Sequence, residues 1–182
     1  MKIIRVAILG AECVGKTTLC NELKQSMASF QIDTKIAPEA LREFCIQNNR
    51  VPRIDEQFSI MREQAVLEDF DDKDHQSDQC RLTLSDCAPI TIAIYSELYF
   101  SDLSLYSEAD EFHKNYDLSL LLTPNIGWQS DGIFRESPQA QQRFHHRIKH
   151  WLESSSHPWL EISDVGEQRT KGAISAIIPS LR

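Results

Sequence analysis

The sequence predicts an α/β fold, in which helices cover both faces of a mainly parallel sheet of five strands. Short runs rich in Ile, Val and Leu alternate along the chain with longer segments that repeat apolar residues at helical spacing. This alternation is typical of three-layer α/β/α domains. The length of 182 residues, with no internal repeat or linker-like tract, indicates one domain over 1–182. Hydrophobic content of 41% and charged content of 25% are ordinary for such a domain.

The first strand and the first helix flank a recognisable motif. A short apolar run at Ile3–Leu9 suits a strand buried in a parallel sheet. Leu19 and Leu23 lie four residues apart, which places them on one face of a helix. Between this strand and this helix, residues 10–17 read Gly-Ala-Glu-Cys-Val-Gly-Lys-Thr and fit the phosphate-binding pattern G-x-x-x-x-G-K-[ST]. The motif therefore stands between a strand and a helix, as the P-loop NTPase fold requires.

This motif predicts where a nucleoside triphosphate binds. Its glycines adopt backbone angles that other residues avoid, so several N–H groups converge on phosphate oxygens at a helix N-terminus. Lys16 is expected to reach the β and γ phosphates, and Thr17 to offer its hydroxyl to Mg²⁺. The expected ATP-binding residues of this loop are Gly10, Glu12, Cys13, Val14, Gly15, Lys16, Thr17 and Thr18.

The remaining elements follow in alternation. Further strands are expected at 31–36, 81–86, 117–123 and 158–162, and helices at 39–45, 55–70, 91–100, 139–152 and 170–178. The helix over 55–70 is expected to bury Phe58, Met61, Ala65 and Leu67. The polar segment 102–111 is expected to be a loop or a mobile segment that faces the substrate. The acidic stretch 68–78 is expected to be a solvated helix end and loop.

Two carboxylates are candidates for the chemistry that phosphoryl transfer needs besides the phosphate loop. Asp86 ends the third strand, and ligands of doubly wound sheets lie beyond the carboxyl ends of the strands. If strands one and three are neighbours, Asp86 either holds Mg²⁺ or accepts the proton of an acceptor hydroxyl. Its alternative role is to cap the helix that follows. Glu39 follows the second strand and either faces the acceptor or only stabilises a helix N-terminus.

A glycine-bearing segment at 125–135 is expected to be a lid. Within it, Arg135 either neutralises the transferred phosphoryl group on closure, as an arginine finger in cis does, or pairs with a nearby carboxylate. Trp128 either stacks on a planar acceptor ring or anchors the core. Arg169 is expected in a loop near the adenine of ATP.

Together these segments resemble the ribosylnicotinamide kinase domain of NadR-type proteins and the related small AAA-labelled P-loop ATPases and kinases. The resemblance is carried by 10–17, 39–43, Asp86 with the helix after it, and the pattern W-x-x-D-G-x-x-R at 128–135. It implies transfer of the γ-phosphate of ATP to the 5′-hydroxyl of a nucleoside such as nicotinamide riboside. In that picture Asp86 serves the acceptor hydroxyl or Mg²⁺.

The resemblance also implies roles in the lid segment and shows one departure. Trp128 and Asp131 are expected to contact the substrate, and Arg135 to act from the lid. Where the family carries a second acidic residue after the third strand, this chain has Ala88.

The charge and motif content disfavour other classes of function. A formal net charge of −8 and the lack of a long basic run argue against nucleic-acid binding. The guanine-reading segment Asn-Lys-x-Asp is missing, which weakens a GTPase interpretation. The expected partner is a small-molecule acceptor, a nucleoside, and the alternative is a regulatory ATPase that acts on a protein partner. The oligomeric state is left open.

Cysteine and histidine spacing gives no support for a metal site. The five cysteines contain no C-x-x-C pair, and their odd number fits a reducing cytosol. No signal peptide and no apolar run of about 20 residues is seen, so we expect a cytoplasmic protein without a membrane span. The histidines expected on helix surfaces are His113, His145, His146, His150 and His157.

Overall fold

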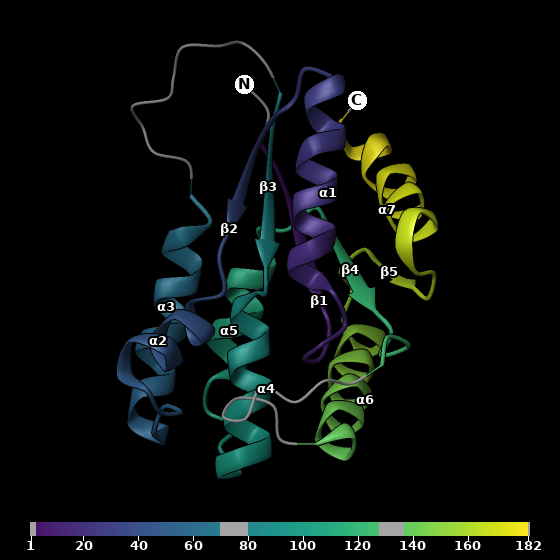
Figure 1. Ribbon diagram of the computed structural model, residues 1–182. Coiled ribbons are helices and arrows are strands. Elements are labelled where there is room, and N and C mark those ends of the chain that lie inside the picture. The colour runs from purple at the N-terminus through teal and green to yellow at the C-terminus, as the bar shows by residue number, and fades with distance from the viewer. Residues whose placement is uncertain (1–2, 70–79, 128–136, 182) are drawn as a thin grey trace.

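The computed structural model describes residues 3–69, 80–127 and 137–181 (Figure 1). Within these ranges five strands form one sheet in the order β2-β3-β1-β4-β5, and every pairing is parallel. The strands are β1 Ile3–Leu9, β2 Asp33–Ala37, β3 Arg81–Asp86, β4 Leu118–Leu122 and β5 Trp159–Ile162. The predicted α/β class is confirmed, and the sheet is parallel throughout rather than mainly so.

The helices form the two outer layers (Figure 1). On one face α1 (Lys16–Ser29) packs beside α7 (Gly166–Leu181). On the other face α4 (Pro89–Phe100) lies among α3 (Gln57–Leu67), α5 (Tyr106–His113) and α6 (Pro138–Ser154). The short α2 (Ala40–Asn48) packs on α3 and is joined to it by a 3-10 turn, η1 (Ile54–Glu56). These helices bury the sheet from both sides.

The strand register brings the carboxyl ends of β1 and β3 together. Ile8 of β1 pairs with Asp86, the last residue of β3. All six residues of β3 are buried, because helices cover both faces of this inner strand. The expectation that strands one and three are neighbours is confirmed, and it fixes Asp86 at the edge of the sheet where the P-loop begins.

The expected buried face of α3 is right at Met61 and wrong at Phe58. Phe58 is 42% exposed, whereas the amides Gln57 and Gln64 are 2% and 0% exposed. The buried stripe runs through Gln57, Ile60, Met61 and Gln64. Apolar periodicity missed this stripe because two of its four members are polar, and Gln64 is accommodated by hydrogen bonds rather than by apolar contact.

Two polar segments differ from expectation where the structure describes them, and residues 70–78 of the acidic stretch lie outside the described residues. The segment 102–111 contains most of α5, which packs on α4 and is tied to it by a hydrogen bond from the Tyr106 hydroxyl to Glu97. Glu68, expected at a solvated helix end, is only 6% exposed, because its carboxylate accepts hydrogen bonds from Tyr116 and Gln64. Contacts with segments distant in sequence therefore account for the packing of α5 and for the burial of Glu68.

The histidines divide between core and surface. His113 is fully buried against the edge of Trp151, and its Nε2 lies 2.9 Å from the Ser119 hydroxyl. Burial, assisted by nearby His157, lowers the pKa of His113 to about 3. His145 is also buried, so the expectation of surface histidines is wrong for these two. In the described ranges no group of three or more His, Cys, Asp or Glu side chains could hold a metal ion.

Candidate active site

The phosphate loop adopts a backbone that only glycine fits at its first position. Gly10 has φ +148°, and a Cβ there would lie 2.8 Å from Val14 Cγ2 and 3.1 Å from the Leu122 carbonyl oxygen. Gly15 has φ +85° and immediately precedes α1. The loop therefore packs tightly against the end of β4 and directs the helix N-terminus toward the site.

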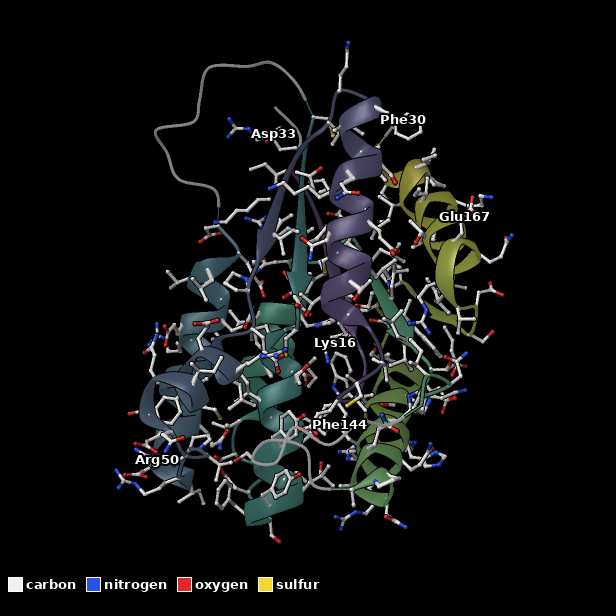
Figure 2. All side chains as sticks on the ribbon, in the orientation of Figure 1. Lys16, Phe30, Asp33, Arg50, Phe144 and Glu167 are labelled. Carbon is white, nitrogen blue, oxygen red and sulfur yellow. The ribbon has the colours of Figure 1, made fainter. Side chains whose placement is uncertain are left out.

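Lys16 is held inside the loop at the start of α1. Its Nζ donates to the carbonyl oxygens of Gly10 and Ala11 at 3.1 Å and 3.0 Å. Burial alone would lower the pKa of Lys16, but nearby negative charge, most of all that of Glu39, raises it above its ordinary value. Lys16 is therefore a permanent cation that anionic phosphate oxygens can draw away from two neutral carbonyls. Figure 2 shows it at the end of α1 near the middle of the molecule.

Thr17 and Asp86 meet beside this lysine. Thr17 Oγ1 donates to Asp86 Oδ2 at 2.5 Å, and Asp86 is 5% exposed. The second oxygen, Oδ1, is buried and has no hydrogen-bond partner among the described residues. A hydroxyl and a carboxylate with a spare oxygen are the hard oxygen donors that Mg²⁺ takes at nucleotide sites, where the phosphates supply further ligands. The pair therefore fits the predicted Mg²⁺ site.

Glu39 stands at the entrance to α2 and faces the same site. Its backbone is extended, and its side chain makes no cap hydrogen bond to the N–H groups of α2. Burial raises the pKa of Glu39, the charge of Asp86 adds to this effect, and the charge of Lys16 opposes it. These mutual influences place the three groups close together. Ala88, which stands where the resembled family carries a second acid, is packed in the core.

One cavity of about 780 Å³ joins the phosphate loop to a second wall. That volume lies in the range of about 300–1,000 Å³ usual for small-molecule and cofactor sites. The loop wall runs from Glu12 to Thr18, and the second wall includes Glu39, Arg42, Pro52, Gln57, Tyr95 and Tyr99. Apart from Glu39, sequence reasoning missed this second wall.

The second wall combines aromatic rings with an unsatisfied amide. Tyr95 and Tyr99, one helical turn apart on α4, stack with their ring centroids 5.8 Å apart. The Tyr95 hydroxyl donates to Glu12 Oε1 at 3.3 Å, which links this wall to the phosphate loop. Gln57 is 2% exposed, and its Oε1 has no hydrogen-bond partner within the described ranges. Gln57 thus brings an acceptor without a described partner to the wall of the cavity.

Arg169 lies in the first turn of α7 rather than in a loop. Its guanidinium donates to three acceptors: the Val14 carbonyl oxygen, the Asp164 carbonyl oxygen and Asn125 Oδ1. It also packs so closely on Gly15 that a Cβ there would lie 3.2 Å from Nη1. Arg169 thus clamps the phosphate loop from outside, and the other predicted cation, Arg135, lies outside the described residues together with Trp128 and Asp131.

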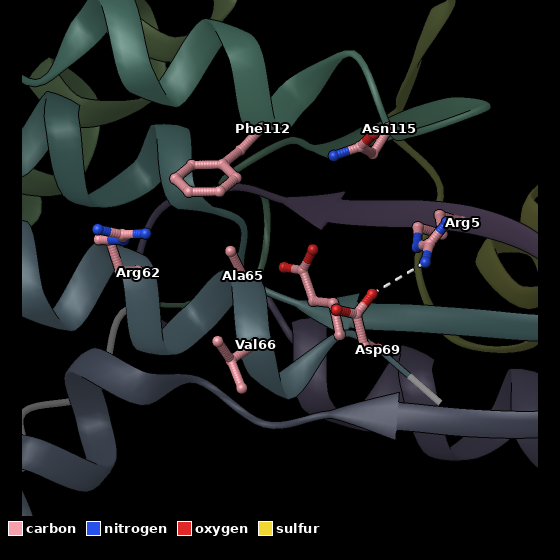
Figure 3. Close-up of a pocket in the computed structure, with 8 residues that line it drawn as sticks. Arg5, Arg62, Ala65, Val66, Asp69, Phe112 and Asn115 are labelled. Atoms are coloured by element: carbon pink, nitrogen blue, oxygen red, sulfur yellow. Dashed lines mark hydrogen bonds and ion pairs between the residues drawn. The ribbon is translucent and has the colours of Figure 1, made fainter. Parts of the chain in front are cut away.

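A second, smaller cavity of about 280 Å³ lies at the C-terminal end of α3 (Figure 3). Arg5, Arg62, Glu68, Phe112 and Asn115 are among its lining residues. Arg5 Nη2 forms an ion pair with Asp69 Oδ1 at 3.0 Å across its edge. Burial raises the pKa of Glu68 to about 7. Of the residues predicted for phosphoryl transfer, none that the structure describes lines this cavity.

All five cysteines are free, and the described helices are each too short or too polar to span a bilayer. No curated protein matches the chain.

Solved structures show the same fold at low sequence identity. NadR in complex with NR superposes with a TM-score of 0.72 at 21% identity, over 97% of this chain and 51% of the other. NadR with NAD and AMP-PNP gives a TM-score of 0.69 at 19% identity, over 98% and 49%. The chain thus spans about half the length of the NadR chains. Deoxyadenosine kinase from M. mycoides with bound dCTP gives a TM-score of 0.61 at 11% identity, over 97% and 100%.

A family profile covers most of the sequence. The profile described as AAA domain matches residues 5–169, a range that includes the phosphate loop, Glu39, Asp86 and Arg169. The chain belongs to this AAA domain family of P-loop proteins.

Proposed function

We propose that the chain is an ATP-dependent kinase that transfers the γ-phosphate of ATP to a hydroxyl of a nucleoside. The supporting observation is that one cavity has Lys16 and Thr17 in one wall and Glu39 and Gln57 in the other. A kinase must hold donor and acceptor in one water-poor space. An ATPase needs only a water molecule and has no use for a second wall that carries rings and a buried amide.

The donor half orients the triphosphate. Loop N–H groups and the dipole of α1 hold the phosphates, and Lys16 places its charge against the β and γ phosphates. Thr17 and Asp86 would hold Mg²⁺, which when bound supplies positive charge that offsets the charge developing on the phosphates. Arg169 contributes to ATP binding by fixing the backbone of Val14.

The acceptor half supplies the base. Glu39 takes the proton of the acceptor hydroxyl as its oxygen bonds to the γ-phosphorus, and the bond from that phosphorus to the bridging oxygen breaks to release ADP. Of the two carboxylates, Glu39 suits this role better, because Asp86 already accepts the Thr17 hydroxyl. A carboxylate with a raised pKa is also a stronger base.

Ring stacking and one amide suit a nucleoside as the acceptor. Tyr95 and Tyr99 offer an aromatic surface to a planar base, and Gln57 Oε1 accepts a hydrogen bond from it. The NadR structure with NR makes nicotinamide riboside the first acceptor to test. In the proposed kinase, Arg135 acts as a lid cation, and Trp128 and Asp131 contact the substrate. A cytoplasmic location is also retained.

The test is acceptor-dependent turnover. The protein is incubated with Mg-ATP and a panel of ribosides and deoxyribosides, and ADP and phosphorylated nucleoside are measured together. At least one acceptor should raise ADP formation in step with a nucleoside monophosphate. Lys16→Ala should abolish this turnover, whereas Lys24→Ala, an exposed lysine on the same helix, should not. ADP formation that no acceptor raises would contradict a kinase and favour the regulatory ATPase.

A further inference from the structure

The N-terminus of α2 is capped by a side chain from another helix. A helix leaves its first N–H groups without partners, and the residue before the helix usually supplies a side-chain acceptor. Here that residue is Glu39, whose side chain caps nothing. Instead the Ala40 N–H donates to Gln64 Oε1 of α3 at 2.9 Å, in a buried contact. Gln64 therefore caps the N-terminus of α2, and the Glu39 carboxylate is not needed as a cap.

The orientation of Gln64 is fixed by what lies on its other side. Its Nε2 donates to Glu68 Oε1 at 3.3 Å, and the Tyr116 hydroxyl donates to the same oxygen at 2.5 Å. A carboxylate only accepts hydrogen bonds, so turning the Gln64 amide over would set its oxygen against Glu68 and its nitrogen against an N–H. Gln64 is fully buried, and no water reaches it to replace a lost partner.

The far end of this relay, which runs Ala40–Gln64–Glu68, is anchored to the sheet. Glu68 is the residue directly after α3, and its main-chain oxygen accepts from Thr83 Oγ1 of β3 at 3.4 Å. Tyr116 comes from the segment between α5 and β4. The relay thus connects the start of α2 with β3, the strand that carries Asp86, over a path that does not pass through the phosphate loop.

We propose that Gln64 is a positioning residue for phosphoryl transfer. It fixes the backbone at the Glu39–Ala40 junction from outside the site, so that the Glu39 carboxylate points at the acceptor instead of folding back onto its own helix. This inference rests on the proposed function, because it explains how Glu39, the proposed base, is held in place. Small misplacements matter in such sites, because a shift of about 1 Å can cost roughly 10²-fold in rate.

The central test is Gln64→Met, which keeps the length and fills the buried space but removes both hydrogen bonds. Its kcat for acceptor phosphorylation should fall by roughly 10–100-fold, while the KM for ATP stays within twofold of wild type. Exchange of the Ala40 amide hydrogen should accelerate, because its acceptor is gone. Gln47→Met, at an exposed position on α2, is the matched control and should change none of these quantities.

A rescue variant separates positioning from general damage. Gln64→Glu alone places a second carboxylate against Glu68 and should be as slow as Gln64→Met at pH 8. Adding Glu68→Gln exchanges the two groups, so that the new carboxylate accepts from Ala40 and the new amide donates to it and accepts from Tyr116. The double variant should recover most of the wild-type kcat. Failure of the exchange to recover kcat, with both variants folded, would overturn the proposal.

The remaining outcomes are also decisive. Wild-type kcat in Gln64→Met would overturn the positioning role, and so would an equal loss of kcat and ATP affinity, which indicates a structural role. If no acceptor supports turnover in the wild type, the proposed function fails. The relay can still be tested, because NMR of the Glu39 carboxyl carbon follows the titration of this side chain. The relay predicts that Gln64→Met shifts the Glu39 titration toward that of an exposed glutamate. An unchanged titration together with rapid Ala40 exchange would overturn it.

Discussion

Thr17 Oγ1 donates a 2.5 Å hydrogen bond to Asp86 Oδ2, which joins the first turn of α1 to the end of β3. The hydroxyl uses only one carboxylate oxygen, and the other is buried beside the phosphate loop with no partner among the residues that the structure describes. The pair therefore has the donors and the spare coordination that the magnesium of a bound nucleotide needs.

Asp86→Asn should test this arrangement. The amide oxygen can still accept from Thr17, but the negative charge is lost, so the Mg²⁺ concentration for half-maximal turnover should rise and kcat should fall by about 10–100-fold. Binding of metal-free ATP should not weaken. A Mg²⁺ titration of turnover and calorimetry of ATP binding measure the two effects. Asp55→Asn, an exposed carboxylate on η1, is the control, and an unchanged Mg²⁺ requirement in Asp86→Asn would exclude Asp86 from the metal site.

Glu39→Gln should remove the general base. Since burial raises the pKa of Glu39, the wild-type rate should climb with pH through a value above that of an ordinary glutamate, as the carboxylate forms. The variant should lose this ascending limb and be roughly 10²–10⁴-fold slower. The pKa of Lys16 is raised, so the lysine stays charged across the same range. A pH–rate profile from pH 5 to 9 checks this, and an ascending limb that persists in Glu39→Gln would assign the base elsewhere.

Arg169→Ala should loosen the phosphate loop. It removes a buried cation that donates to Val14, Asp164 and Asn125, so the free energy of unfolding should fall by about 2–3 kcal/mol. ATP should also bind more weakly, because the Val14 carbonyl is no longer held in place. Urea unfolding and calorimetry measure the two quantities. Arg143→Ala on the exposed face of α6 is the control, and full ATP affinity in Arg169→Ala would show that the clamp does not shape the loop.

Glu68→Gln should stabilise the protein at neutral and alkaline pH. The pKa of Glu68 is about 7 in the folded protein because burial raises it from 4.5, so the folded state binds more protons than the unfolded state between these values. Stability contributed by the protonated acid is present below pH 4.5 and lost as pH rises through 7. The variant should therefore gain up to about 3 kcal/mol at pH 8 and little at pH 4. Urea unfolding at several pH values, beside Glu63→Gln of the same helix, measures the gain, and a gain equal at both pH values would contradict it.

The donor half of the site could be predicted from sequence because its signals are local. The phosphate loop is contiguous, and Asp86 closes an apolar run that reads as a strand without reference to the rest of the chain. Apart from Glu39, the acceptor half could not, because its wall residue Gln57, like Gln64 outside the site, is a polar residue on a helix whose apolar pattern pointed to Phe58. Their burial follows from the packing of α3 against α2, and that of Gln64 also from its hydrogen bonds to Ala40 and Glu68. The position of Arg169 was misjudged for a related reason, since α7 begins earlier than its apolar spacing suggests.

The two walls of the large cavity come from different parts of the all-parallel fold. The phosphate loop and Asp86 lie at the ends of β1 and β3, two neighbouring inner strands of the sheet. The second cavity wall comes from α2 and the loop after it, from Gln57 of α3, and from Tyr95 and Tyr99 of α4. For the proposed kinase, substitutions at the cavity-wall positions of the segment 40–57 should therefore alter which compound is phosphorylated while the phosphate loop stays intact.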